Sequence, residues 1–282
     1  MPRPHCLFIQ SQDLPWRPGY WTGFRPETAT RTLSIEADQS AATLLVRFPA
    51  GWSAPSWEHW PCLEELLVLE GSLEINGSTY GPQHYAALPP FYPRVSQSSR
   101  DGAVALVMLH GRPEPVATGA IPPFDPALLV RHVDPLALDW DPGLVDPQLA
   151  PGVAIKPLRT DPYSGETTFL YMSPPHRVPP GLAKPQWTHS MVEELYVLCG
   201  EYVWADCGRM GPGAYVWWRE GVKHGPAGTD VGYLLLVRTI GGPLDNIFDT
   251  EPKPFRWDPA FRPELPPELL ALARPYQRST LY

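Results

Sequence analysis

The stretch WTHSMVEELYVLCG, residues 187–200, decides the fold of this 282-residue chain. It places a His and two adjacent Glu at the start of an apolar run that ends on a Gly. Short runs of Val, Leu and Tyr bounded by Gly are typical of β-strands. A similar phrase, WEHWPCLEELLVLEG, stands at residues 57–71. The sequence therefore predicts, twice, a strand that carries polar residues into an apolar setting.

The repetition extends well beyond these two phrases. EELLVLEGSLEI at residues 64–75 matches EELYVLCGEYVW at 193–204, and YGPQHYAALP at 80–89 matches MGPGAYVWWR at 210–219. The offset between matching segments stays at about 124–130 residues, which is the size of a domain rather than of a solenoid repeat. We therefore predict two similar domains in tandem.

Each copy has the pattern of an all-β domain. Short apolar runs are separated by Gly, Pro and Asn, and Asn76-Gly77 is a strong hairpin signal. The 38 prolines are spread between these runs, as expected for many strands joined by rigid turns. Helical periodicity is weak except at residues 266–276, where we expect one short helix that ends at Pro275.

Composition and charge exclude several classes of function. The net charge is −8 and no stripe of basic residues is present, so nucleic acid is not an expected partner. The segment MPRPHCLFIQSQDLPW at the N-terminus holds no apolar run of the length of a signal peptide or membrane span, which favours a cytoplasmic location. Four scattered cysteines favour reduced thiols over a disulfide scaffold: Cys6, Cys62, Cys199 and Cys207.

The order His, a gap of three or four residues, Glu, six residues, Gly, and then a later Gly-Pro strand and a His resembles the cupin superfamily. Two copies resemble a bicupin. The phrases DLPW, EELYVLCGE and WREGVKHGP are most similar to the subgroup that resembles the cupin domain of the anti-sigma factor ChrR. The resemblance covers roughly residues 10–245 and implies two tandem jelly-roll barrels, with metal ligands projecting into a barrel mouth.

In the second copy, the resemblance implies the metal ligands His189, Glu193 and His224, while Trp187 stands where the family has a further His. Two imidazoles and one carboxylate are the facial set of non-haem iron sites, with positions left open for substrate. The implied cofactor is a divalent metal, Fe(II) or Zn(II), with Mn(II) as a further option. Taken singly, each His could equally be an ordinary core residue.

In the first copy, the corresponding residues are Trp57, His59, Glu64 and Arg94. Arg keeps its proton, so Arg94 would repel a cation and could pair with Glu64 instead. We therefore expect a degenerate site in this copy.

The surroundings of the two sites are less certain from sequence. Candidate walls of a substrate pocket in the second copy are four aromatic residues: Trp187, Tyr196, Tyr215 and Trp217. Trp57 and Trp187 could form an aromatic wall or simply fill the space of a lost ligand. The second Glu of each pair, Glu65 and Glu194, is expected on the opposite strand face, solvated or in a salt bridge.

These patterns predict an N-terminal barrel at residues 1–118, a metal-binding barrel at 119–245 and a strap with a short helix at 246–282. The predicted function is a metal-dependent enzyme acting on an oxygen-bearing small molecule at the C-terminal barrel. Among the possible reactions, we expect a dioxygenase-type oxidation before an isomerase, lyase or hydrolase reaction. The alternative is a cupin that binds or senses a metal or small molecule without turnover. A monomer and a homodimer are both compatible with two barrels in one chain.

Overall fold

The computed structural model describes residues 3–21, 24–54, 57–116, 121–146, 148–204 and 207–277. The fold is all-β, as predicted, with two barrels and a single short α-helix among these residues. Contacts divide the chain into two units. One unit consists mainly of Pro15–Leu138, and the other combines Pro4–Leu14 with the chain from Asp139 onwards. No helix in the described ranges is long and apolar enough to cross a membrane.

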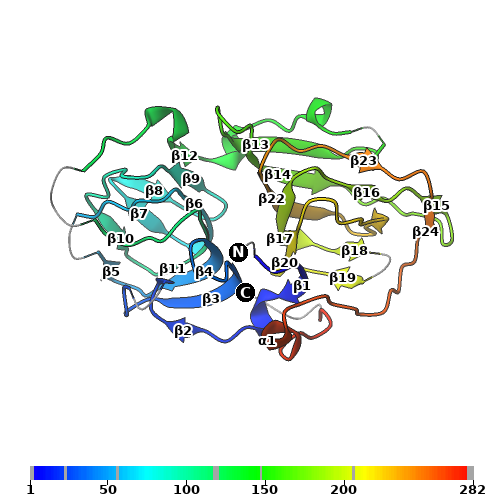
Figure 1. Cartoon of the computed structure of the whole chain (residues 1–282), viewed down its shortest axis with the longest axis horizontal. Helices are drawn as coiled ribbons and strands as arrows, with labels where there is room; N and C mark the ends of the chain where they lie inside the picture. Colours follow the sequence, from blue (N-terminus) through cyan, green and yellow to red (C-terminus); the bar gives the residue numbers. More distant parts are fainter. Residues whose placement is uncertain are drawn as a thin grey trace. The chain divides into compact units, whose positions relative to one another are not determined.

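The first barrel consists of a seven-stranded and a four-stranded antiparallel sheet (Figure 1). The larger sheet has the strand order β12-β9-β6-β11-β4-β3-β2. Its strands are β2 (Arg17–Pro18), β3 (Ala29–Ile35), β4 (Ala42–Phe48), β6 (Glu64–Gly71), β9 (Tyr85–Leu88), β11 (Ala103–Leu109) and β12 (Val130–Val133). The smaller sheet, in the order β5-β10-β7-β8, contains β5 (Trp52–Ser53), β7 (Leu73–Ile75), β8 (Ser78–Tyr80) and β10 (Gln97–Ser99).

The core of the first barrel lies between these two sheets. Alternate side chains of β4, including Leu44 and Val46, form one buried cluster with Leu73 and Ile75 of β7. Because successive side chains on a strand point to opposite faces, this alternation buries one face of each sheet against the other. The result is the sandwich of a jelly roll.

The second barrel repeats this arrangement. Its main sheet has the order β1-β20-β17-β22-β14-β13, and a three-stranded sheet β19-β18-β21 faces it. The main strands are β1 (Cys6–Gln10), β13 (Ala154–Thr160), β14 (Thr167–Ser173), β17 (Val192–Gly200), β20 (Ala214–Trp218) and β22 (Tyr233–Ile240). The facing strands are β18 (Tyr202–Trp204), β19 (Gly208–Met210) and β21 (Ala227–Gly228). Leu195 and Val197 of β17 pack with Tyr202 and Trp204 of β18 in the core.

Two short strands do not follow the linear division of the chain. The N-terminal strand β1 pairs with β20 and so completes the sheet of the second barrel. Strand β12, which the sequence places in the second domain, pairs with β9 in the sheet of the first. The boundary expected between residues 118 and 119 lies outside the described residues.

The C-terminal segment adds two small ladders to the second barrel. Strand β16 (Trp187–Thr188) pairs with β23 (Ile247–Phe248), and β15 (Ala183–Lys184) pairs with β24 (Lys253–Pro254). The helix α1 spans only Pro267–Leu270 and is shorter than the helix expected at residues 266–276. A chain this rich in proline favours tight turns over longer helices.

Several connections between strands are short 3-10 helices, and the local sequence favours them. Three of them begin at an Asp followed by a Pro, at Asp125, Asp134 and Asp141, and each carboxylate accepts a hydrogen bond from the backbone amide two residues on. These turns are Pro126–Leu128, Pro135–Ala137 and Pro142–Leu144, and a fourth spans Ser11–Asp13. Asp and Ser side chains favour such turns because they satisfy free backbone amides.

The glycine that ends each repeated strand is required by a close backbone approach. At Gly71 the φ angle is +69°, and a Cβ there would meet the Gly102 carbonyl oxygen at 2.0 Å. At Gly200 the φ angle is +76°, and a Cβ would meet the Gly232 carbonyl oxygen at 2.1 Å. Both positions therefore exclude a side chain on conformational and steric grounds.

We predict that Gly71→Ala and Gly200→Ala each lower the free energy of unfolding by about 3 kcal/mol or more. The added Cβ both strains the positive φ angle and forces the facing backbone carbonyl to move. Gly51 and Gly221 are matched controls, with φ angles of +74° and +71° and nothing within 4 Å of the added Cβ. Alanine at either control position should cost only about 1 kcal/mol. Urea unfolding of the four variants measures this, and equal losses at all four positions would contradict the steric argument.

Candidate metal centre

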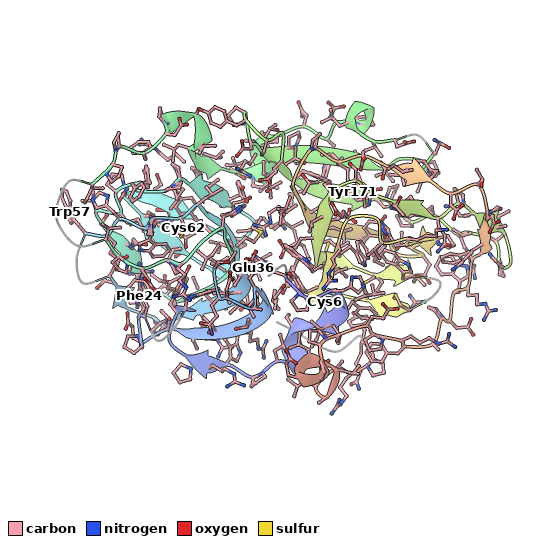
Figure 2. The ribbon with its side chains drawn as sticks, viewed as in Figure 1. Cys6, Phe24, Glu36, Trp57, Cys62 and Tyr171 are labelled. Atoms are coloured by element: carbon pink, nitrogen blue, oxygen red, sulfur yellow. The ribbon has the colours of Figure 1, made fainter. Side chains whose placement is uncertain are left out.

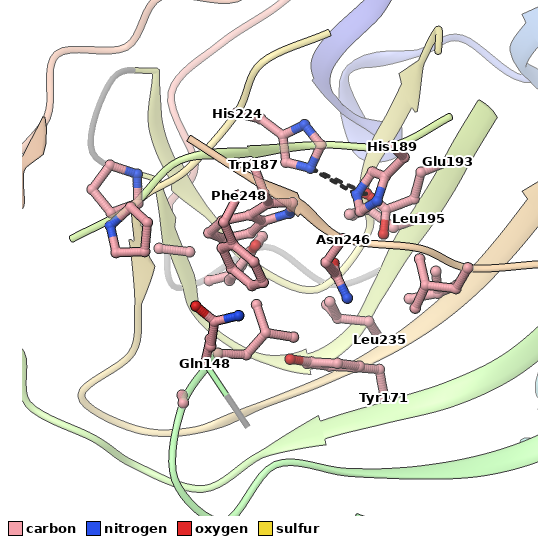
Figure 3. A pocket seen from close by; sticks show the side chains of 18 of the residues that line it. Gln148, Tyr171, Trp187, His189, Glu193, Leu195, His224, Leu235, Asn246 and Phe248 are labelled. Atoms are coloured by element: carbon pink, nitrogen blue, oxygen red, sulfur yellow. Dashed lines mark hydrogen bonds and ion pairs between the residues drawn. The ribbon is translucent and has the colours of Figure 1, made fainter. Parts of the chain in front are cut away.

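Three metal-ligating side chains converge in the second barrel. His189 follows β16, Glu193 lies at the start of β17, and His224 precedes β21. The two Nε2 atoms are 3.0 Å apart. Glu193 Oε2 lies 3.4 Å from His189 Nε2 and 3.7 Å from His224 Nε2 (Figure 3). One ligand atom from each residue lies within 4.8 Å of the others, so the structure brings together the three residues that the sequence nominates.

Backbone carbonyl groups fix the tautomer of both imidazoles. His189 Nδ1 donates to the carbonyl oxygen of Asp245, and His224 Nδ1 donates to that of Val222 at 2.8 Å. A carbonyl oxygen only accepts, so Nδ1 carries the proton on each ring and each neutral ring presents a lone pair at Nε2. Two lone pairs facing each other repel unless a proton or a cation lies between them. The donor set therefore fits a divalent metal, and the carbonyls are the outer partners that orient metal-binding His.

The electrostatics of Glu193 and His224 favour the protonation states of metal ligands, whereas those of His189 favour the charged ring. Burial lowers the pKa of His224 to about 4, and the attraction of Glu193 only partly opposes this. Burial alone would raise the pKa of Glu193, but the neighbouring His189 and His224 lower it overall. Burial also lowers the pKa of His189, but Glu193 and Asp245 together outweigh burial, so the net shift is upward and a metal would have to displace a proton from this ring. An ionised carboxylate and a neutral imidazole are the forms that bind metals.

Aromatic side chains hold the His224 ring in place. Trp218 stacks on it with 4.3 Å between ring centroids and 11° between planes. Trp187 meets it edge to face at 5.3 Å. Gly225 allows this approach, because a Cβ there would lie 2.5 Å from the Trp187 ring. The ring is thus held by packing as well as by its hydrogen bond.

A pocket of about 760 Å³, counting the part open to solvent, lies beside the three donors. Most of its wall is apolar, and the polar side chains Gln148 and Asn246 project into it (Figure 3). The remaining lining residues are Leu149, Ala150, Phe169, Tyr171, His176, Lys184, Pro185, Trp187, Leu195, Tyr202, Pro226, Ala227, Tyr233, Leu235, Val237, Leu244 and Phe248. A small molecule can therefore reach the donors.

Of the four aromatic walls expected from the sequence, only Trp187 lines this pocket. The alternation of the main sheet explains the difference. Glu193 pairs with Trp218 and Glu194 with Trp217, so Trp218 faces inward and Trp217 outward. Tyr196 and Tyr215 are directly opposite each other on the outward face, where their hydroxyl groups contact Ser11 and Glu194 respectively. These three residues support the sheet from behind the site.

The first barrel repeats the frame of the site with different residues. The Gly221 amide donates to the His189 carbonyl oxygen at 2.9 Å, and in the first barrel the Phe91 amide donates to that of Trp60 at 2.7 Å. Likewise the bridge between Trp187 and His224 has its counterpart between Glu58 and Arg94. The structural equivalents of Trp187 and His189 are therefore Glu58 and Trp60.

The sequence alignment instead pairs Trp57 and His59 with these positions, and the structure corrects it by one residue. His59 and Glu64 are five residues apart, whereas His189 and Glu193 are four apart. The extra residue shifts everything before Glu64 by one position. Trp57 is consequently 69% exposed on the outside of the barrel (Figure 2). The His59 Nδ1 contacts the Phe91 carbonyl oxygen at 3.0 Å.

A buried cation from the chain itself occupies the first site. Arg94 is fully buried and donates to Glu64 at 3.0 Å, as the sequence predicts. Tyr20 donates to the same carboxylate at 2.7 Å, and the Arg94 guanidinium lies 4.0 Å from the centre of the Trp60 ring. The guanidinium balances Glu64 and fills the position that His224 has in the second barrel.

A second buried ion pair, which sequence reasoning missed, completes this site. Arg25 pairs with Glu58, and Gln97 donates to the same carboxylate at 3.1 Å. The only local hint in the sequence was Glu58 itself, an acidic residue between the motif residues Trp57 and His59. Its role depends on Arg25, more than thirty residues earlier, and no local pattern links the two.

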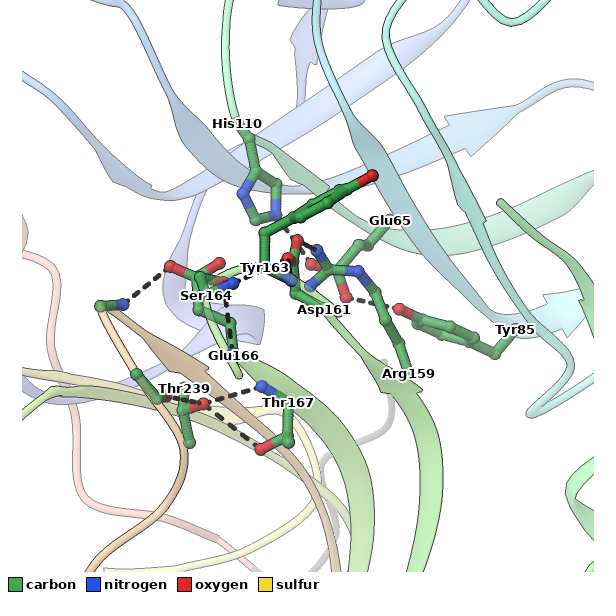
Figure 4. Close-up of polar contacts among 12 residues, drawn as sticks. Glu65, Tyr85, His110, Arg159, Asp161, Tyr163, Ser164, Glu166, Thr167 and Thr239 are labelled. Carbon is green, nitrogen blue, oxygen red and sulfur yellow. Dashed lines mark hydrogen bonds and ion pairs between the residues drawn. The ribbon is translucent and has the colours of Figure 1, made fainter. Parts of the chain in front are cut away.

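The second Glu of each pair lies on the opposite strand face, as expected, and both are salt-bridged rather than solvated. Glu65 is fully buried and contacts His110 and Tyr85 (Figure 4). Glu194 pairs with Arg238 in the second barrel.

Comparisons with known proteins agree with this architecture. Residues 131–241 match the family model of the ChrR cupin-like domain. A candidate dioxygenase from Nostoc punctiforme has a TM-score of 0.73 at 19% identity, over 90% of this chain and 91% of that one. A candidate glyoxylate-induced protein from Pseudomonas aeruginosa has a TM-score of 0.55 at 14% identity, over 86% and 91%. Oxalate decarboxylase from Bacillus subtilis has a TM-score of 0.50 at 12% identity, over 86% and 78%. A comparison with curated protein sequences gives no match.

The chain therefore has the duplicated jelly-roll fold of its structural neighbours. The range that matches the ChrR cupin-like family model, residues 131–241, contains His189, Glu193 and His224.

The buried pair in the first barrel allows a double-mutant test. Arg94→Met should lower the free energy of unfolding by about 3–5 kcal/mol, because it leaves the Glu64 carboxylate buried and unpaired. Adding Glu64→Gln should recover part of this loss, giving a coupling energy of about 1–3 kcal/mol. The pair Arg112–Glu114, 48% and 64% exposed, is the control and should couple by less than about 0.5 kcal/mol. Equal coupling in both cycles would contradict the role assigned to Arg94.

Proposed function

We propose that the second barrel is a metal-dependent catalytic site that carries out a dioxygenase-type reaction on an oxygen-bearing small molecule. The observation that carries this proposal is the approach of two Nε2 atoms, those of His189 and His224, to 3.0 Å from each other. They lie beside the Glu193 carboxylate at the wall of an open pocket. His189, Glu193 and His224 would hold the metal. Fe(II) is the proposed ion, because two imidazoles and one carboxylate are the donor set of non-haem iron oxygenases.

A bound metal of this kind would polarise a substrate oxygen and provide open positions for substrate and dioxygen. The chain's own residues do the rest. Glu193 supplies the single negative charge of the donor set. Apolar side chains such as Phe169 and Leu235 exclude water from the pocket, and the amides of Gln148 and Asn246 can orient a polar substrate. Aromatic packing by Trp218 keeps His224 from moving when substrate enters.

Similarity to the candidate dioxygenase from Nostoc punctiforme over nine-tenths of both chains supports the choice of reaction class. Isomerase, lyase and hydrolase reactions use the same donor set. The choice of an oxidative reaction therefore rests on this similarity.

One observation favours a second candidate function, which is metal binding without turnover. The family model that matches the metal-binding barrel is that of the ChrR cupin-like domain. A sensing role would be served by a closed metal site with zinc held tightly. The open pocket beside the donors favours catalysis over this alternative.

His224→Ala should reduce the affinity for Fe(II) or Zn(II) by at least about 100-fold, because removing a direct ligand costs more than removing its outer partner. The matched control is His176→Ala, a residue that lines the same pocket outside the donor set. Metal content after dialysis, measured by mass spectrometry, should fall only in the first variant. Retention of one metal per chain by His224→Ala would contradict the site.

The open coordination positions can be tested without knowing the substrate. Fe(II)-loaded protein exposed to nitric oxide, an analogue of dioxygen, should give the electron paramagnetic resonance signal of a high-spin iron–nitrosyl species. Glu193→Gln should weaken metal binding and abolish this signal. Stoichiometric metal with no nitric oxide signal would indicate a closed site and favour the non-catalytic alternative.

A further inference from the structure

The pocket wall contains a cation that the proposed metal site does not use. Lys184 lies in β15 and lines the pocket together with Trp187 and the three donors. Within the described ranges, no acidic side chain pairs with it, and it is the only Lys or Arg among the lining residues. Lys223, in contrast, is exposed and pairs with Asp249.

The partial burial of Lys184 is not compensated by an acidic partner among the described residues. Desolvation by burial lowers the pKa of Lys184, and it is the single cause of the shift. A half-buried cation without a partner loses part of its hydration, which an anionic ligand would offset.

A second polar group lies beside Lys184. His176 Nδ1 donates to the Pro174 carbonyl oxygen at 3.3 Å, so its Nε2 carries a lone pair when the ring is neutral. Within the described residues this Nε2 is buried and has no hydrogen-bond partner. Burial, with a contribution from the Lys184 charge, lowers the pKa of His176 and keeps the ring neutral. The two residues thus offer a positive charge and a hydrogen-bond acceptor to the same occupant.

We propose that Lys184 determines substrate specificity by binding an acidic group, so that the substrate of this pocket is an organic acid with an apolar body. Its carboxylate contacts the Lys184 ammonium, and a neighbouring O–H or N–H donates to His176 Nε2. The apolar body packs against Trp187, Phe248 and Tyr171 of the lining. This inference rests on the proposed function in one respect, namely that the pocket is a substrate site. The binding of an acid to Lys184 does not depend on it.

The test compares 2-naphthoate with its neutral isostere 2-naphthamide, and follows binding by calorimetry. It uses the full-length chain stripped of metal with a chelator, so that the carboxylate cannot bind a metal instead, and circular dichroism checks the fold of each variant. The unmodified chain should bind naphthoate about 10-fold or more tightly than naphthamide, the size of effect expected for a partly desolvated charge pair. Lys184→Gln should remove this preference, and Lys184→Arg should keep most of it.

A control variant makes the assignment specific. Lys253 is directly opposite Lys184 in the β15–β24 ladder, but it is exposed and lines a different surface hollow. Lys253→Gln should keep the preference for naphthoate.

The inference would be overturned if Lys184→Gln kept the preference for naphthoate, or if Lys253→Gln lost it. The absence of any preference in the unmodified chain would also overturn it. Metal content is measured separately. A chain that binds no metal but prefers naphthoate through Lys184 would contradict the proposed metal chemistry and leave the acid-binding assignment standing.

Discussion

Two hydrogen bonds from imidazole to backbone set the chemistry of the second barrel. The carbonyl oxygens of Asp245 and Val222 each accept from an Nδ1 and so turn the Nε2 lone pairs of His189 and His224 toward each other. The Asp245 carbonyl belongs to the segment that follows the last barrel strand and then pairs, through β23, with β16. The C-terminal segment is thus part of the proposed metal site, because it orients His189 and supplies Asn246 and Phe248 to the pocket.

The two barrels satisfy one electrostatic requirement in different ways. Each buries a carboxylate at the start of an equivalent strand, Glu64 in the first barrel and Glu193 in the second. A buried carboxylate needs a positive partner. In the first barrel the partner is the Arg94 guanidinium, a cation of the chain itself, with Trp60 packed against it. In the second, the proposed partner is a metal ion held with the help of two imidazoles. Of the two cations, only the proposed metal ion could also bind a substrate.

Strand patterns and the internal repeat predicted the duplicated all-β fold, and the resemblance to cupins nominated His189, Glu193 and His224, which the structure brings to one place. Prediction from the sequence failed where a single residue changes the face of a strand. The extra residue before Glu64 moved Trp57 outward, and the alternation of β20 put Trp218 rather than Trp217 at the site. It also could not show that residues far apart in the chain complete a sheet or a site, as β1, Arg25 and Asp245 do. Such contacts depend on tertiary packing, which no local pattern encodes.

X-ray diffraction from crystals grown with Fe(II), with anomalous data at the iron edge, tests the central claim most directly. The account predicts one iron per chain, within about 2.0–2.2 Å of His189 Nε2, His224 Nε2 and a Glu193 oxygen, with at least one position open to the pocket. It predicts no metal beside Arg94 in the first barrel. Iron bound through Nδ1, iron bound elsewhere, or crystals with the three side chains in direct contact and no metal would contradict it.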